Sequence, residues 1–141
     1  MTYPEPLVRP MRDELTRLGV EELKTATDVQ RSFAEGGTNL VVVNSVCGCA
    51  ARNARPAVAI AIEHENLPDR VTTVFAGQDL EATMEARRHF LGFGPSSPSM
   101  ALMKDGDVVF MLERHQIEGR TAEQIARDLI DAFDRYCVTH V

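Results

Sequence analysis

One segment carries most of the structural information in this sequence: Asn39-Leu40-Val41-Val42-Val43-Asn44-Ser45-Val46-Cys47-Gly48-Cys49. Its apolar, β-branched run at residues 40–43 predicts a strand buried on both faces. Small, helix-compatible residues follow, Ala50-Ala51-Arg52-Asn53-Ala54-Arg55. We therefore expect two thiols where a buried strand ends and a helix begins. Unpaired N–H groups and partial positive charge at a helix start favour thiolate over thiol.

The part of the chain before this strand contains two helix patterns. Residues 3–10 hold three prolines and are expected to run extended across the surface. A short amphipathic helix that stops at Gly19 is predicted by Met11, Leu15 and Leu18. A capping box at Thr27-Asp28-Val29-Gln30 predicts a second helix, which ends at Gly36-Gly37.

Helix and strand patterns alternate after the cysteines. The first helix is expected to reach about residue 65 and to kink at Pro56, which removes a backbone donor. Residues 71–75 predict the next strand. Asp79 can cap the helix that follows, and its inward-facing residues are expected to be Leu80, Met84 and Leu91.

The last third of the chain predicts a hairpin and a final helix. Asp105-Gly106 indicates a tight turn between strands at residues 99–104 and 107–113. A capping box at Thr121-Ala122-Glu123-Gln124 opens the last helix. Strand–helix–strand order gives a parallel pair, and the hairpin adds an antiparallel pair. The expected fold is α/β and thioredoxin-like: residues 1–141 form a single domain, a mixed sheet of roughly four strands with helices on both faces and extra N-terminal helices.

Composition and charge argue against several classes of function. The chain has 141 residues and a net charge of −6, so it lacks the basic footprint of a nucleic-acid-binding protein. No apolar run is long enough to cross a membrane. The start, Met1-Thr2-Tyr3-Pro4-Glu5-Pro6, does not resemble a secretory signal, so we expect a cytoplasmic location. In a reducing cytosol, a close cysteine pair is more often catalytic or metal-binding than structural.

The one-residue spacing of Cys47 and Cys49 favours transient disulfide chemistry. A disulfide across so small a ring is expected to be strained and easily reduced, and Gly48 lets the backbone adopt the dihedral angles that closure needs. The surrounding segment has no acidic residue, whereas Arg52 and Arg55 lie within two turns of the thiols. Their positive charge should lower a thiol pKa, with Cys47 as the nucleophile and Cys49 as the resolving thiol.

Two other interpretations of the cysteine pair stay open. A C-x-C pair can supply zinc ligands, but structural zinc sites usually need four ligands, and Cys137 and the histidines (His64, His89, His115 and His140) show no ligand spacing. The cysteines could also be inert, buried residues. Their position at a strand–helix junction favours redox chemistry over both.

A proline in the last third completes the expected site. The thioredoxin plan places a cis proline just before a strand, facing the cysteines. Ser97-Pro98 has that position in the chain, and Pro95 is the competing choice. Here the topology, and not the local sequence, favours the cis form, because most X-Pro bonds are trans.

Several segments resemble the bacilliredoxin family of bacterial thioredoxin-like proteins. They are residues 41–51 with the CGC motif, Ala54-Arg55-Pro56-Ala57, Ser96-Ser97-Pro98-Ser99 and Gly119-Arg120. The resemblance covers nearly the whole chain. It implies a thioredoxin-like fold, weak disulfide reductase or isomerase activity, and removal of bacillithiol from mixed disulfides on proteins. For this chain it implies Cys47 as the attacking thiol, Cys49 as the resolving thiol and Pro98 as the cis proline beside them.

We therefore expect a thiol–disulfide oxidoreductase that needs no cofactor and no metal, because the cysteines carry the redox equivalents. Its partners would be proteins with mixed disulfides, a low-molecular-weight thiol and a separate thiol reductant, without nucleic acid or membrane. The alternatives are a protein disulfide isomerase and, in another class, a metal-binding module built on the cysteine pair. The expected residues around Cys47 and Cys49 are Gly48, Arg52, Arg55, Ser97 and Pro98.

Overall fold

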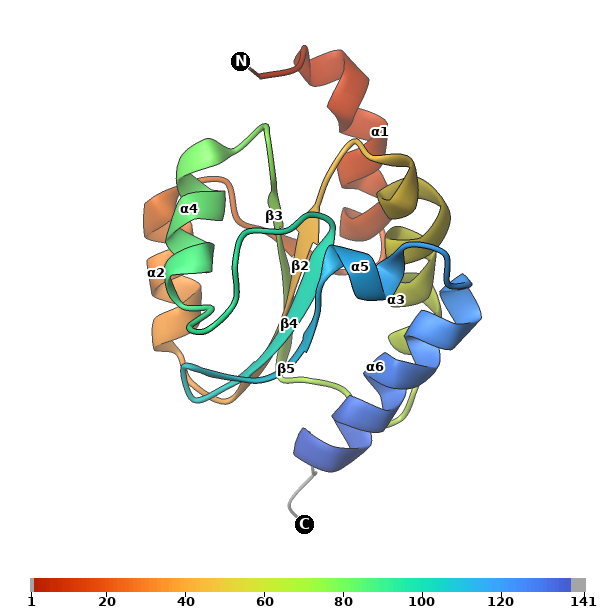
Figure 1. Ribbon diagram of the computed structural model, residues 1–141. Helices are drawn as coiled ribbons and strands as arrows, with labels where there is room; N and C mark the ends of the chain where they lie inside the picture. The colour runs from red at the N-terminus through yellow and green to blue at the C-terminus, as the bar shows by residue number, and fades with distance from the viewer. Residues whose placement is uncertain (1, 138–141) are drawn as a thin grey trace.

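The computed structural model of the protein describes residues 2–137, which form one sheet between two layers of helices (Figure 1). The sheet has five strands in the order β1-β3-β2-β4-β5. Their bounds are β1 Glu21–Glu22, β2 Thr38–Asn44, β3 Arg70–Phe75, β4 Ser99–Lys104 and β5 Asp107–Leu112. One face is covered by α2 (Ala26–Ala34) and α4 (Leu80–Arg88), and the other by α1 (Glu5–Thr16), α3 (Arg55–Ala61) and α6 (Ala122–Tyr136). The expected mixed α/β plan is confirmed, and β1 is the strand that the sequence did not indicate.

β2 is the central strand, and all of its residues are buried. It runs parallel to β3 and antiparallel to β4. Leu40 and Val42 belong to the core beneath α1, α3 and α6, whereas Val41 and Val43 belong to the core beneath α2 and α4. Because successive side chains of a strand point to opposite faces, a continuous apolar run suits a strand that is covered on both sides.

Local turn and cap patterns predict several boundaries correctly. Asp105 and Gly106 both have positive φ, 50° and 89°, as a two-residue hairpin turn of type I′ requires. Thr121 caps α6 and shares a capping box with Gln124. Gly19 follows the end of α1 with a φ of 92°. Each of these features depends on a few adjacent residues, which is why the sequence alone predicts them.

The N-terminal segment is helical, so the expected extended run over residues 3–10 is wrong. α1 begins at Glu5, with Pro4 as its N-cap and Pro6 in its first turn. In the first turn, backbone N–H groups have no partner within the helix, so a proline there costs little. Pro10 lies inside the helix. The buried residues of α1 are Val8, Arg12 and Leu15.

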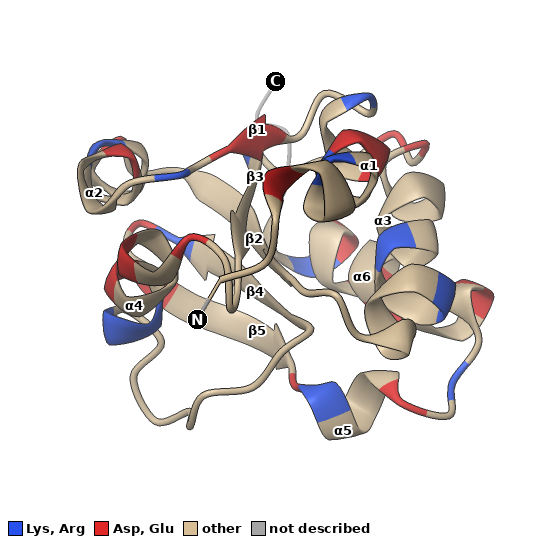
Figure 2. Cartoon of the chain, turned by 90° about the horizontal axis from the view of Figure 1, so that it is seen from above, with Lys and Arg blue, Asp and Glu red and all other residues tan. Residues whose placement is uncertain are grey.

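Arg12 anchors α1 to the end of the sheet at which β3 finishes. Its guanidinium donates to Asp79 at 2.6 and 3.0 Å. It also donates to Glu5 at 2.7 Å and to Glu22 at 3.2 Å, and it lies 5.3 Å from the centre of the Phe75 ring. Figure 2 shows the acidic stretches of β1 and of the start of α1 close together. Asp79 is the N-cap residue of α4, but its carboxylate binds Arg12 and makes no cap hydrogen bond.

The second helix begins earlier than expected. Thr25 is its N-cap, because Thr25 Oγ1 accepts the N–H of Asp28 at 3.0 Å and Asp28 Oδ2 accepts the N–H of Thr25 at 3.3 Å. The capping box is therefore Thr25 to Asp28 and not Thr27 to Gln30. An aspartate at the third helical position makes the same reciprocal bonds as the more common glutamate. The helix ends before Gly36, as expected.

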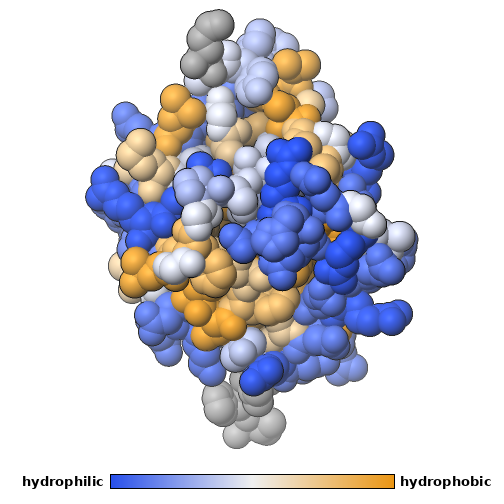
Figure 3. Space-filling model, viewed as in Figure 1, coloured by the Kyte–Doolittle hydropathy of each residue, from blue (hydrophilic) through white to orange (hydrophobic). Residues whose placement is uncertain are grey.

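α4 packs with its small residues inward, which corrects the expectation that Leu80, Met84 and Leu91 face the core. These three residues are 51%, 61% and 79% exposed, whereas Ala82 and Ala86 are buried. Alanine has no side-chain atoms beyond Cβ, so this face lets α4 pack closely against the core that it shares with α2. Figure 3 shows apolar patches among the polar surface, including the side where Figure 1 draws α4.

The helix after the cysteines ends earlier than expected and changes its hydrogen-bond pattern before Pro56. A π-helical turn, η1 (Ala50–Ala54), precedes α3, and the N–H of Arg55 bonds to the carbonyl oxygen of Ala50. Pro56 has no N–H to donate and its ring crowds the preceding turn, so a wider turn ahead of it relieves both problems. Single π turns within helices often occur at functional sites.

Candidate functional site

Cys47 lies where the chain turns from β2 into the helix. β2 ends at Asn44 and the first helical residue is Gly48, so Cys47 is in the N-cap position and Cys49 is in the first turn. The carbonyl oxygen of Cys47 accepts the N–H of Ala51 at 3.2 Å. The Cys47 sulfur accepts the N–H of Cys49 at 3.4 Å. Both cysteines are unpaired and half-buried.

The acidities of the two thiols are shifted in opposite directions. The pKa of Cys47 is lowered, first by the N–H of Cys49 that its sulfur accepts, and further by the Cys49 thiol and the positive charge of Arg114. The pKa of Cys49 is raised, first by burial and then by Cys47 and the negative charge of Glu118. Cys47 is therefore the thiol that ionises first, while Cys49 stays protonated to higher pH.

A buried polar cluster fixes the backbone that leads into Cys47. Arg55 Nη1 donates to Asn44 Oδ1 and to the carbonyl oxygen of Ser45, both at 2.9 Å. Arg55 Nε bonds to the carboxylate of Glu14 in α1. Ser45 Oγ in turn accepts the N–H of Cys47 at 3.2 Å. Arg55 thus orients the loop ahead of the nucleophile and has a carboxylate partner of its own. The expected lowering of a thiol pKa by the charge of Arg55 stays a prediction.

The sheet brings the Ser97–Pro98 segment next to the cysteine loop. The register of β2 and β4 ends with Val43 opposite Ser99, so Pro98, which precedes Ser99, lies near the end of β2 that leads into the cysteine loop. The Ser97–Pro98 peptide bond is cis, and Pro98 is buried. Pro95, the competing choice, is exposed. Pro98 therefore lies beside the loop that carries the thiols.

Arg114 is a residue of this site that the sequence analysis missed. It opens the short helix α5 (Arg114–Ile117), one residue after the end of β5, and Figure 2 shows the basic colour on α5. Arg114 Nη1 donates to the carbonyl oxygen of Ser97 at 3.3 Å, and its backbone N–H donates to Ser96 Oγ at 3.4 Å. Its Nε pairs with Glu118. Arg114 thus connects the segment before the cis proline to the thiols.

The register of the hairpin explains why the sequence gives no signal for Arg114. Next to the turn Lys104 pairs with Asp107, but a β-bulge between Leu102 and Met103 shifts the pairing by one residue, so that Met100 pairs with Leu112. A register counted from the turn alone would bring Pro98 opposite Glu113, and nothing in the sequence indicates the bulge.

Arg52 lies over Gly48, the residue between the two cysteines. A Cβ built on Gly48 would come 2.9 Å from Arg52 Nη2 and 3.2 Å from Arg52 Cζ. Positions four apart share one face of a helix, so the guanidinium reaches back over a turn to the glycine. The structure thus brings the residues expected around the pair to the cysteine loop: Arg52 lies over Gly48, Arg55 lies at the base of the loop, and Ser97 and Pro98 lie at the neighbouring end of β4.

The rest of the described chain shows neither a metal site nor a membrane span. Within residues 2–137, no three His, Cys, Asp or Glu side chains form a group that could hold a metal ion. In the same residues, no helix is long and apolar enough to cross a membrane. His140, which was considered as a ligand, lies outside them. Cys137 is buried at the end of α6, and burial raises the pKa of its thiol.

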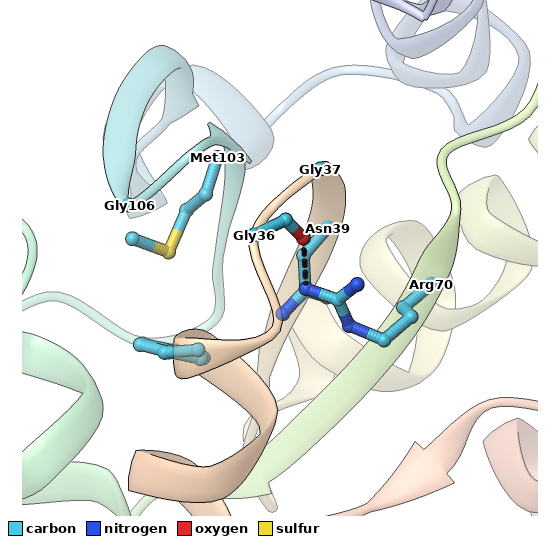
Figure 4. A pocket seen from close by; sticks show the side chains of 7 residues that line it. Gly36, Gly37, Asn39, Arg70, Met103 and Gly106 are labelled. Atoms are coloured by element: carbon cyan, nitrogen blue, oxygen red, sulfur yellow. Dashed lines mark hydrogen bonds between the residues drawn. The ribbon is translucent and has the colours of Figure 1, made fainter.

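A small cavity lies at the amino end of β2, far along the strand from the thiols. Its lining includes Gly36, Asn39, Arg70 and Met103 (Figure 4). Its volume is ≈ 10 Å³, about the space of one water molecule. Arg70 Nη2 donates to the carbonyl oxygen of Gly36 at 2.7 Å, drawn as the dashed line in Figure 4. A cavity of this size is too small for a substrate thiol.

Relatives of known name match almost the whole chain. Residues 3–137 match the family model described as disulphide isomerase. The chain is 58% identical over 140 residues to a bacilliredoxin of Salinibacter ruber, which covers 97% of this chain and 82% of the relative. It is 50% identical over 135 residues to a bacilliredoxin of Staphylococcus haemolyticus, with 96% of this chain and 93% of the relative covered.

Solved structures with the thioredoxin fold resemble this one. Fasciola hepatica thioredoxin has a TM-score of 0.58 and 21% identity, over 83% of this chain and 99% of that one. A putative oxidoreductase with a thioredoxin fold has a TM-score of 0.62 and 13% identity, over 82% of this chain and 93% of that one. At such identities the likeness concerns the fold alone, and it confirms the expected thioredoxin-like architecture.

Proposed function

The chain belongs to the bacilliredoxin family of thiol–disulfide oxidoreductases, and we propose that it removes a low-molecular-weight thiol of the bacillithiol type from mixed disulfides on proteins. Cys47 is the attacking thiol and Cys49 the resolving thiol. Gly48, Arg52, Arg55, Ser97 and Pro98 support them. The whole chain acts as one thioredoxin-like domain.

The observation that carries this proposal is the difference between the two thiols. The Cys47 sulfur accepts the N–H of Cys49 at 3.4 Å, and the pKa of Cys47 is lowered. Burial raises the pKa of Cys49. The thiolate is the attacking species in disulfide exchange, so a pair with these acidities attacks through Cys47 and resolves through Cys49.

The proposed reaction has two exchanges and a separate reduction. The Cys47 thiolate attacks the sulfur of the small thiol, so a disulfide forms between them and the target protein leaves as a thiolate. Cys49 loses its proton and attacks the Cys47 sulfur, which releases the small thiol as its thiolate. The resulting Cys47–Cys49 disulfide takes two electrons from a separate thiol reductant, which is oxidised in turn.

The proposed setting follows from the same chemistry. The partners are proteins that carry mixed disulfides, the small thiol and the reductant. The location is the cytoplasm, where a reducing thiol pool keeps a catalytic pair available for the next cycle. The odd number of cysteines, three, makes a poor disulfide framework, which supports this setting.

A release assay tests the proposal. A model protein with a single cysteine is loaded with bacillithiol, and the freed protein thiol is measured over time in the presence of a thiol reductant. We expect multiple turnovers with the wild-type chain, no release above background with Cys47→Ser, and unchanged release with Cys137→Ser. Release that persists in Cys47→Ser would contradict the assignment of the nucleophile.

A second candidate function, protein disulfide isomerase, is favoured by the raised pKa of Cys49. A mostly protonated resolving thiol closes the ring slowly, which leaves a mixed disulfide with a substrate protein time to rearrange. Refolding of scrambled ribonuclease separates the two functions. An isomerase keeps its activity in Cys49→Ser, whereas a reductase that depends on Cys49 for release loses its multiple turnovers.

A further inference from the structure

Arg52 holds a positive group directly over the residue that separates the two thiols. A Cβ built on Gly48 would lie 2.9 Å from Arg52 Nη2, 3.2 Å from Arg52 Cζ and 3.3 Å from Arg52 Nη1. Helical side chains lean toward the N-terminus of their helix, which carries this guanidinium back over the first turn. The glycine provides the space in which it lies.

Arg52 differs from the other arginines near the cysteines because it has no acidic partner. Arg55 bonds to Glu14, and Arg114 pairs with Glu118. Within residues 2–137, the Arg52 side chain makes neither an ion pair nor a hydrogen bond, and it is exposed. In a chain with a net charge of −6, an unpaired guanidinium over the glycine between the two cysteines is available to an anion from outside.

The guanidinium is suited to one chemical group in particular. It presents donors in a planar fork and no acceptor, which matches the two oxygens of a carboxylate. During the first exchange the small thiol becomes bonded to Cys47, next to Gly48 and Arg52. A carboxylate on that thiol could then reach the guanidinium, whereas a neutral or cationic thiol would gain nothing from it.

We propose that Arg52 makes the site selective for mixed disulfides whose small thiol carries a carboxylate. This inference rests on the proposed function and adds a residue that selects the small substrate by its charge. Arg52 acts on the first exchange, in which the Cys47–sulfur bond forms and the bond between target protein and small thiol breaks. It transfers no proton or electron, so it is a specificity residue.

A matched pair of substrates tests the proposal. One target protein is loaded either with 3-mercaptopropionate or with 3-mercaptopropionamide, which have nearly the same shape and differ in charge. The second-order rate constant for release of the target thiol is measured with each. We expect the wild-type chain to prefer the carboxylate roughly three- to tenfold, less at high salt, because the contact is exposed and ionic.

Three variants separate recognition from other effects. Arg52→Gln should lower the carboxylate-to-amide rate ratio to near one, and Arg52→Lys should keep part of it, because the charge stays and the fork is lost. Arg114→Gln should slow both substrates alike, because Arg114 acts on the Cys47 thiolate. Since the target protein is the same throughout, a preference that follows the small thiol cannot arise from acidic residues of the target.

The outcomes distinguish this inference from the proposed function. Equal wild-type rates for the two substrates, or an Arg52→Gln variant that slows both equally, would overturn the role of Arg52 and leave the thiol-removal activity standing. Absence of release from either substrate, and from the bacillithiol-loaded protein, would overturn the proposed function and this inference with it.

Discussion

The guanidinium of Arg114 donates to the carbonyl oxygen of Ser97 at 3.3 Å. This hydrogen bond joins the first residue of α5 to the residue whose peptide bond with Pro98 is cis. The same arginine contributes positive charge to the neighbourhood of Cys47. Two segments far apart in the sequence are therefore held together at the thiols by one side chain.

Replacing Arg114 should make Cys47 less reactive. Its charge adds to the effect of the Cys49 N–H in lowering the pKa of Cys47, so Arg114→Gln raises that pKa and reduces the thiolate fraction at neutral pH. We expect alkylation of Cys47 by iodoacetamide at pH 7 to slow roughly two- to fivefold. Arg88→Gln, on α4, is the matched control for loss of one exposed positive charge. Equal rates in wild type and Arg114→Gln would refute the role of Arg114.

The pH dependence of alkylation should separate the two thiols. The pKa of Cys47 is lowered and that of Cys49 is raised, so the pair titrates in two steps, one below and one above the value of an ordinary thiol. As pH falls below that value, the Cys47 thiolate persists after an ordinary thiol has become protonated. Alkylation followed by peptide mass spectrometry should label Cys47 first. Labelling of Cys49 first would reverse the assigned roles.

Removing Arg55 should destabilise the protein, because two buried acceptors each lose a donor. Asn44 Oδ1 and the Ser45 carbonyl oxygen both accept from Arg55 Nη1 at 2.9 Å. We expect Arg55→Gln to lower the free energy of unfolding by about 1–3 kcal/mol in urea denaturation. Arg52→Gln removes the same charge from an exposed position in the preceding turn and should change the free energy of unfolding by less than about 0.5 kcal/mol. Similar losses in the two variants would argue against the buried cluster.

Replacing Arg12 should lower the free energy of unfolding more than replacing Arg55 does. It is 2% exposed and binds Asp79, Glu5 and Glu22, so its removal leaves carboxylates without their partner. Arg12→Gln should lower the free energy of unfolding by about 3–5 kcal/mol. Arg9→Gln on the same helix removes a surface ion pair and should cost about 1 kcal/mol or less. A small loss for Arg12→Gln would show that the cluster contributes little.

Much of the fold could be predicted because its signals are local. The buried run before the cysteines, the turn at Asp105-Gly106 and the cap at Thr121 each depend on adjacent residues and on period or turn chemistry. α4 shows where such patterns fail. Its large apolar residues share one face, but Ala82 and Ala86 form the face that packs, and sequence periodicity does not reveal which face is covered.

The site could be predicted only in part for a related reason. Cys47 and Cys49 are visible as a motif, and Arg52 and Arg55 lie near them in the sequence. Arg114 comes to the thiols through the pairing of three strands, so no local pattern indicates it. The sequence also suggested one shared role for Arg52 and Arg55, but burial separates them, since Arg55 lies inside the fold and Arg52 on its surface.

The order of attack by the two cysteines is the central claim, and trapping tests it most directly. Cys49→Ser chain, in a Cys137→Ser background, is mixed with excess protein carrying bacillithiol, and its mass and the modified residue are determined by mass spectrometry. We predict that Cys47 acquires the small thiol and that an equal amount of target thiol is released. An unmodified Cys47, or a small thiol that appears instead on Cys49 of the Cys47→Ser chain with release of the target thiol, would contradict the account.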